Sequence, residues 1–143
     1  MADTIIIDNG IVTKTLKTTT GETCEVCFNP ADPTFADKLY TAFMNLKKKQ
    51  DEREITTAGM SDSEKFDWFR KQDAEMRKTI DGVFEKPVCE ALFGNVNMYA
   101  SAGGTPVWMN LMLAIMDEMD ESIKREKAFH SEKLAKYTKK YHR

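Results

Sequence analysis

The chain has 143 residues, of which 41% are hydrophobic and 31% are charged, and its formal net charge is −2. This length suits a single domain, residues 1–143, with a modest core, and the absence of any apolar run of roughly 18 residues excludes a membrane-spanning protein. The N-terminus is acidic where an export signal would be basic, and the number of cysteines is odd. We therefore expect a cytoplasmic protein with free thiols and no disulfide framework.

Residues 1–30 are predicted to form a small β-sheet. They are rich in Ile, Val and Thr, and the sequences DNG and TTGE separate short runs, as turns do in β-hairpins. We expect paired strands at 11–18 and 22–28, with the sequence TIII at 4–7 as a candidate third strand.

The second of these strands contains a Cys-x-x-Cys pair, Cys24 and Cys27, which is the spacing found in zinc sites. A structural zinc ion needs two further Cys or His ligands, and only Cys89, His130 and His142 remain in the chain. Residues three apart in a strand also point to opposite faces. We interpret the pair as small residues of a strand and predict no metal.

Residues 31–123 are predicted to form a mainly helical body. Asp32 is the expected N-cap of a first helix, because Pro33 can occupy the first helical position without losing a hydrogen bond. Ser61 and Glu64 have the spacing of a capping box, which begins a second helix. The apolar stripes of these two helices are Phe35, Leu39, Phe43 and Leu46, and then Phe66, Phe69, Met76, Ile80 and Val83. Asp73 falls within the second stripe, and we expect it to face solvent at one edge, while Trp68 lies outside the stripe.

A short third helix is predicted within PVCEALFG, residues 87–94, because proline can begin a helix and glycine often ends one. Gly103 and Gly104 then free the backbone before the longest helix. Thr105 is the expected cap of this helix, and Pro106 is its expected first residue.

The last helix, 105–123, carries an apolar stripe and continues into a charged segment. The stripe consists of Trp108, Leu111, Met112, Ile115, Met116, Met119 and Ile123. Sparse apolar anchors follow at Phe129, Leu134, Tyr137 and Tyr141. We therefore expect the helix to extend beyond the core. Together the elements predict an α+β fold, with a small N-terminal β-hairpin or sheet, a mainly helical body and a long C-terminal helix.

Methionine is concentrated near this helix, where it could serve a binding surface. Five of the nine methionines fall within residues 98–119, and flexible Met side chains suit surfaces that accept varied apolar partners. The candidate partner-binding residues are Trp108, Met109, Met112, Met116 and Met119. The alternative is that they are core residues, since several coincide with the stripe that any core would need. If they are exposed, the chain should self-associate.

Residues 124–143 form a basic helical tail. They contain eight Lys or Arg residues and two Glu residues, a net charge of +6. Such a segment could bind nucleic acid or an acidic protein surface. We favour a simpler interpretation, in which the basic residues complement the negative end of a long helix and keep it in solution. No nucleic-acid-binding motif is present, so we do not expect nucleic acid as the main partner.

The sequence contains no arrangement that predicts catalysis or a cofactor. The glycines of SAGGTPVWMN lack the Lys and Ser or Thr that a phosphate-binding loop needs. Both histidines lie in the basic tail, away from any nucleophile that they could activate. The acidic cluster Asp117, Glu118, Asp120 and Glu121 lacks the spacing of a calcium loop. We therefore expect a protein that is not an enzyme.

The order of these parts resembles the tail assembly chaperones of long-tailed bacteriophages. The resemblance covers residues 25–123 and rests on a charged helical middle, the ALFGN break at Phe93 and Gly94, and the apolar helix that follows. It implies a small protein of the host cytoplasm that keeps the hydrophobic tape-measure protein soluble while tail-tube subunits assemble around it. The long basic tail departs from this pattern.

Two alternatives to a chaperone remain, a structural subunit of a phage particle and a regulatory or nucleic-acid-binding module that acts through the basic tail. The resemblance also implies that a longer form could be made by ribosomal slippage near the end of the reading frame. Lys139 and Lys140, whose codons are rich in adenine, offer a place for it. Adjacent lysines are common, however, and the alternative is that this pair only keeps the terminus in solution.

Overall fold

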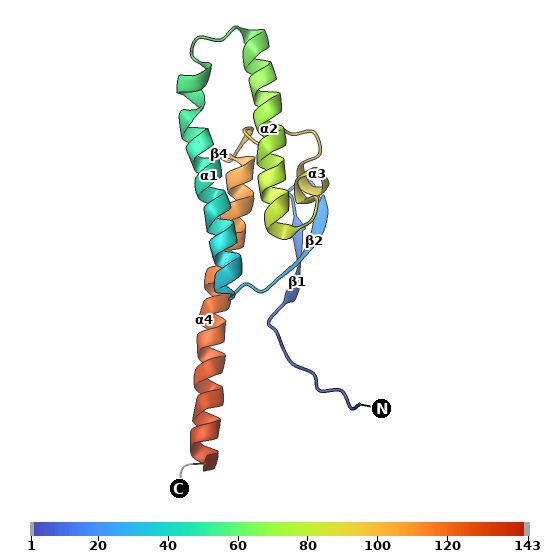
Figure 1. Cartoon of the computed structure of the whole chain (residues 1–143), viewed down its shortest axis with the longest axis vertical. Coiled ribbons are helices and arrows are strands. Elements are labelled where there is room, and N and C mark those ends of the chain that lie inside the picture. The colour runs from blue at the N-terminus through green and yellow to red at the C-terminus, as the bar shows by residue number, and fades with distance from the viewer. Residues whose placement is uncertain (1, 142–143) are drawn as a thin grey trace.

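The computed structural model describes residues 2–141, and its elements form an α+β fold in which a small β-hairpin precedes a helical body (Figure 1). In chain order the elements are β1 (Val12–Lys17), β2 (Thr23–Phe28), α1 (Pro33–Thr57), α2 (Asp62–Phe84), α3 (Val88–Phe93), β3 (Ser101–Ala102), β4 (Thr105–Pro106) and α4 (Val107–Tyr141). His142 and Arg143 and the side chains of Tyr137 and Tyr141 lie outside the described part of the chain, so the anchors expected at the two tyrosines are not tested.

The first two strands pair antiparallel, with Val12 opposite Phe28 and Lys17 opposite Thr23, as the Thr-rich pattern predicted. Strand β2 lies against the helices and buries every second side chain, whereas the side chains of β1 are exposed or half-buried. Cys24 is buried and Cys27 is exposed, which confirms that the two cysteines point to opposite faces.

The prediction of a third strand at residues 4–7 was wrong. Residues 2–11 contain no strand, and Ile5, Ile6 and Ile7 are each more than 80% exposed. High β-propensity is not sufficient for a strand, because a strand also needs a neighbouring strand with which to exchange hydrogen bonds.

Helices α1 and α2 form an antiparallel pair, and both begin at the residues predicted from the sequence. The carboxylate of Asp32 accepts a hydrogen bond from the backbone N–H of Thr34 at 2.9 Å. Ser61 and Glu64 exchange the two hydrogen bonds of a capping box. These contacts satisfy backbone donors that the first turn of a helix leaves without a partner.

Only part of the predicted stripe of α2 is buried. Met76, Ile80 and Val83 belong to the core, but the prediction for Phe66 was wrong, since its side chain is 62% exposed. The tip of the α1–α2 pair projects beyond the rest of the body, so the first turns of α2 have little to pack against (Figure 1). Trp68, which was placed outside the stripe, packs against the core.

Helix α4 begins at Val107, one residue later than predicted, because Thr105 and Pro106 form strand β4 and not the cap and first residue of the helix. They pair with Ser101 and Ala102 around Gly103 and Gly104. The two glycines have φ angles of +64° and +85°, which suit a two-residue hairpin turn and which other residues rarely adopt.

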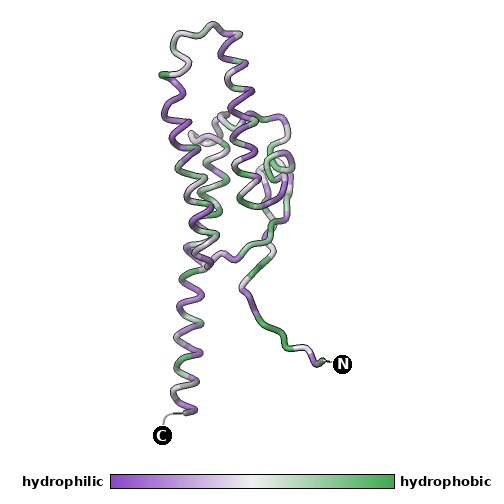
Figure 2. Tube along the Cα trace, viewed as in Figure 1, coloured by the Kyte–Doolittle hydropathy of each residue, from purple (hydrophilic) through white to green (hydrophobic). Residues whose placement is uncertain are grey.

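The first half of α4 lies within the body and the second half projects from it (Figure 1). Trp108, Met112 and Ile115 are almost fully buried, whereas every described side chain from Ile123 to Lys140 is exposed. Figure 2 shows the same division, with many hydrophilic residues along the projecting half. This confirms that the helix extends beyond the core.

Candidate partner-binding site

The five residues predicted to bind a partner lie mainly in the core. Trp108 and Met112 are 0% exposed and Met119 is 7% exposed, while Met109 and Met116 are partly buried against the core. Trp108, Met112 and Met119 are therefore core residues, as in the alternative interpretation, and Met109 and Met116 lie at the edge of the core. That these five residues bind a partner stays a prediction.

Contacts with α1 explain the burial of Trp108. Its indole N–H donates a hydrogen bond to Gln50 Oε1 at 3.0 Å, and its ring packs against Phe43 with a centroid distance of 5.6 Å. The sequence of the last helix alone cannot reveal this, because both contacts come from residues about 60 positions earlier. Without an exposed Met face, self-association cannot rest on these five residues.

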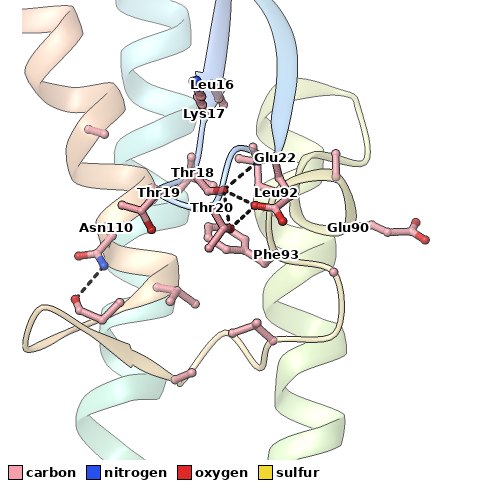
Figure 3. A pocket seen from close by; sticks show the side chains of 18 of the residues that line it. Leu16, Lys17, Thr18, Thr19, Thr20, Glu22, Glu90, Leu92, Phe93 and Asn110 are labelled. Carbon is pink, nitrogen blue, oxygen red and sulfur yellow. Dashed lines mark hydrogen bonds between the residues drawn. The ribbon is translucent and has the colours of Figure 1, made fainter.

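A cavity of about 730 Å³ lies beside the hairpin. Strand β1 and the β1–β2 turn line one side, α3 and its following loop line a second side, and the start of α4 lines the third (Figure 3). Its apolar lining includes Leu16, Leu92, Phe93, Val107 and Leu111. An apolar cavity with a polar rim is the usual form of a binding site.

The polar rim of this cavity comes from the β1–β2 turn. Thr18 Oγ1 donates a hydrogen bond to Glu22 Oε2 at 2.5 Å, and Thr20 donates to the same carboxylate oxygen. The hydrogen bond from Thr18 is the main cause that lowers the pKa of Glu22, and that from Thr20 is the second. The carboxylate therefore stays ionised and holds the turn closed at neutral pH (Figure 3).

Opposite the turn, Asn110 on α4 donates a side-chain hydrogen bond to the carbonyl of Ala102 at 3.0 Å. This bond joins α4 to the short β3–β4 hairpin. The rim thus consists of two local hydrogen-bonded groups, with no described hydrogen bond between the β1–β2 turn and Asn110. The cavity stays open between them.

A second polar group, of which only Asp73 stood out in the sequence, connects α2 to the loop after α3. The Arg77 guanidinium contacts Asp73 Oδ2 at 3.0 Å and the carbonyls of Gly94 and Val96 at 2.7 Å each. Asp73 also accepts a hydrogen bond from the backbone N–H of Met98 at 2.7 Å. The prediction that Asp73 faces solvent at the stripe edge was wrong, and the i, i+4 spacing with Arg77 was the available signal.

The thiol of Cys89, which lies near the Asp73–Arg77 pair, does not have the properties of a nucleophile. Cys89 is buried, and its backbone N–H donates to Asp81 Oδ1 at 3.0 Å. Burial, and after it the negative charge of Asp81, raises the pKa of the Cys89 thiol far above its ordinary value. The thiol is therefore protonated, and reactivity requires the thiolate. The Asp73–Arg77 pair therefore serves to hold the loop after α3 in place.

A third group connects β1 to the point where α4 leaves the body. Glu118 forms ion pairs with Lys14 at 3.0 Å and with Arg125 at 2.9 Å. The hydrogen bond from Lys14 is the main cause that lowers the pKa of Glu118, followed by the one from Arg125. Beyond Glu118, the exposed large apolar side chains of the projecting helix are Ile123, Phe129 and Leu134.

The described residues contain no cluster of three or more His, Cys, Asp or Glu side chains that could hold a metal ion. His130 lies exposed on the projecting helix. None of the helices within residues 2–141 is both long enough and apolar enough to span a bilayer. In comparisons with known proteins, no family model, curated protein or solved structure matches this chain.

Proposed function

We propose that this chain is a non-enzymatic phage tail assembly chaperone, which binds apolar helices of the tape-measure protein in the host cytoplasm while tail-tube subunits assemble. The resemblance in the order of its parts gives the class of function. The observation that carries the proposal is the projecting half of α4, where the apolar side chains of Ile123, Phe129 and Leu134 are exposed.

The placement of these three side chains suits helical partners. Ile123 and Leu134 are eleven residues apart, close to three helical turns, so they share one face of α4. Phe129 lies on another side of the helix. Apolar side chains at such spacings are the anchors by which amphipathic helices pack against one another. The proposed contact therefore moves from the Met-rich stripe, which is buried, to this exposed half.

The charged residues around the apolar anchors are consistent with a chaperone. Between 124 and 143 the net charge is +6, which keeps an exposed helix in solution when no partner is bound. A tape-measure helix would cover the apolar side chains and leave the charges in water. The complex would then remain soluble, although the tape-measure protein alone would not.

The test is co-expression of the full chain with an aggregation-prone fragment of a phage tape-measure protein, followed by measurement of the soluble fraction of that fragment. The wild-type chain should raise this fraction. The double variant Ile123→Glu/Leu134→Glu should lose most of the effect, because it places two charges on the face that these two apolar side chains share.

The control variant is Ala128→Glu/Ala135→Glu, which adds the same charge at exposed positions of the same helix and keeps both large apolar side chains. It should behave as the wild type does. Equal loss in both double variants would show that charge, not apolar contact, governs binding, and no effect of the wild-type chain would reject the chaperone proposal.

The nucleic-acid alternative makes an opposite prediction about salt. Binding through Lys and Arg releases counterions and weakens steeply as salt rises, whereas apolar contact persists. A complex with the tape-measure fragment that survives about 0.5 M salt, at which charge interactions are strongly screened, supports the chaperone. Tight binding to DNA at low salt without any effect on the fragment would favour the regulatory module.

A further inference from the structure

The β1–β2 sheet covers the core incompletely on one side. The alternate residues Cys24, Val26 and Phe28 of β2 are buried. Of the residues opposite them on β1, Lys14 and Leu16 are half-buried and Val12 is exposed. Strand β1 has one neighbouring strand, so the backbone groups along its outer edge are not paired with another strand. The outer edge of β1 is thus open to a further strand.

The cavity of about 730 Å³ lies along this outer edge. Its walls include Thr15, Leu16 and Lys17 of β1 and, across the opening, Leu111 and Ala114 of α4. The Lys14–Glu118 ion pair bridges the same two elements close by. A strand added to β1 would therefore lie over the cavity, with alternate side chains directed into it.

The chain contains a segment with the composition of a strand that makes no strand contact. Ile5, Ile6 and Ile7 are 84%, 93% and 81% exposed, and the segment that contains them extends away from the body. Figure 2 shows it as a hydrophobic stretch near the N-terminus. Three consecutive β-branched apolar residues in water favour pairing with the edge of a sheet.

Local contacts direct this segment away from the edge of its own β1. Asn29, which follows β2, donates a side-chain hydrogen bond to the carbonyl of Asn9 at 3.0 Å. Gly10 packs so closely against Asn29 that a Cβ at this position would lie 2.5 Å from Asn29 Nδ2. The chain is thus held on the β2 side of the hairpin and leaves the body on the side away from α4 (Figure 1).

We propose that residues 4–7 of one copy add as a strand to the free edge of β1 in a second copy and place isoleucine side chains in the cavity between β1 and α4. The charges agree with this pairing, because Asp3 and Asp8 flank the donated segment and Lys17 belongs to the receiving strand. Strand addition to an open sheet edge is a known mode of recognition. If the exchange is reciprocal, each copy donates and receives one strand about a two-fold axis.

The first test is the mass of the full chain in solution at micromolar concentration, measured by light scattering. The expected mass is at least twice the 16.4 kDa of one chain. The donor variant Ile5→Ser/Ile6→Ser/Ile7→Ser should be monomeric. Its control is Ile55→Ser, since Ile55 is also 83% exposed but lies on α1, away from the proposed contact.

The receiving side is tested by Ala114→Glu, which places a longer charged side chain in the cavity from an exposed position of α4. This receiver variant should also be monomeric. Circular dichroism spectra that match the wild type would show that both variants are folded. The decisive step is to mix the two variants, because the receiver variant still has its isoleucines and the donor variant still has its cavity.

Mixing should restore a complex with one intact strand contact, and only docking between copies has this result. A wild-type chain that is monomeric, a donor variant that remains associated, or a mixture that stays monomeric would each overturn the proposal. No tape-measure fragment is present in these measurements, so their outcome does not depend on the chaperone function.

Discussion

Replacement of Arg77 by alanine should destabilise the fold, because the guanidinium joins α2 to the loop after α3. Arg77 makes three hydrogen bonds, to Asp73 and to the carbonyls of Gly94 and Val96. Its side chain is 19% exposed and that of Asp73 is 21% exposed, so solvent screens the pair only in part. A hydrogen bond to a charged group contributes about 1.5–3 kcal/mol, and shared bonds do not add fully.

From these values we expect Arg77→Ala to lower the free energy of unfolding by about 3 kcal/mol. For a chain of this size that corresponds to a fall in Tm of about 6–12 °C. Urea titration followed by circular dichroism measures the change, and an unchanged m-value would show that the loss belongs to the folded state and not to the unfolded ensemble.

The matched control is Arg70→Ala, two turns earlier on α2. Arg70 pairs with Asp67 at the surface, where the two side chains are 69% and 59% exposed, and exposed pairs of this kind contribute about 0–1 kcal/mol. If Arg77→Ala costs no more than Arg70→Ala, the loop after α3 is not held by this guanidinium and the reasoning fails.

Three further predictions concern other parts of the body. The pKa of Glu118 is lowered in the folded protein, so its ion pairs stabilise the fold above about pH 4.5, the ordinary pKa, and this contribution is lost as the pH falls through the pKa of the folded protein. Glu118→Gln should therefore make the urea midpoint less dependent on pH in the acid range. Trp108→Ala should cost about 3–5 kcal/mol in the same titration, because it leaves a cavity at the centre of the core. In the native protein a maleimide should label Cys27 quickly and the two buried cysteines only at the rate of unfolding, and mass spectrometry after timed quenching counts the labels.

Signals from short segments predicted the elements of this fold well. The Thr-rich alternation located both strands of the hairpin to within a residue or two, and the N-cap Asp32 and the capping box at Ser61 marked the helix starts. The glycine at 94 marked the end of α3, where it has a φ of +52°. These signals depend on residues within four positions of one another, so the sequence contains all that they need.

The site depends on contacts between distant parts of the chain, which short sequence patterns do not reveal. Trp108 is buried by residues of α1, and Arg77 is fixed by carbonyls about 17–19 positions away. The apolar stripe of α4 was identified correctly, but its spacing cannot decide between a core and a binding surface, because both need the same pattern. The cavity beside β1 arises only when the hairpin, α3 and α4 come together.

Helix α4 is continuous from the core to its projecting end, so movement at one end is transmitted to the other. One helix of 35 residues carries both the buried Trp108 and the exposed Leu134, and its part beyond Ile123 is about 27 Å long at 1.5 Å per residue. No break in the helix separates the two halves, so a tilt of about 5° at the core would move the far end by roughly 2 Å. A load on the projecting end would therefore act as torque on the packing around Trp108, and the packing of that core would set the direction in which the helix projects from the body.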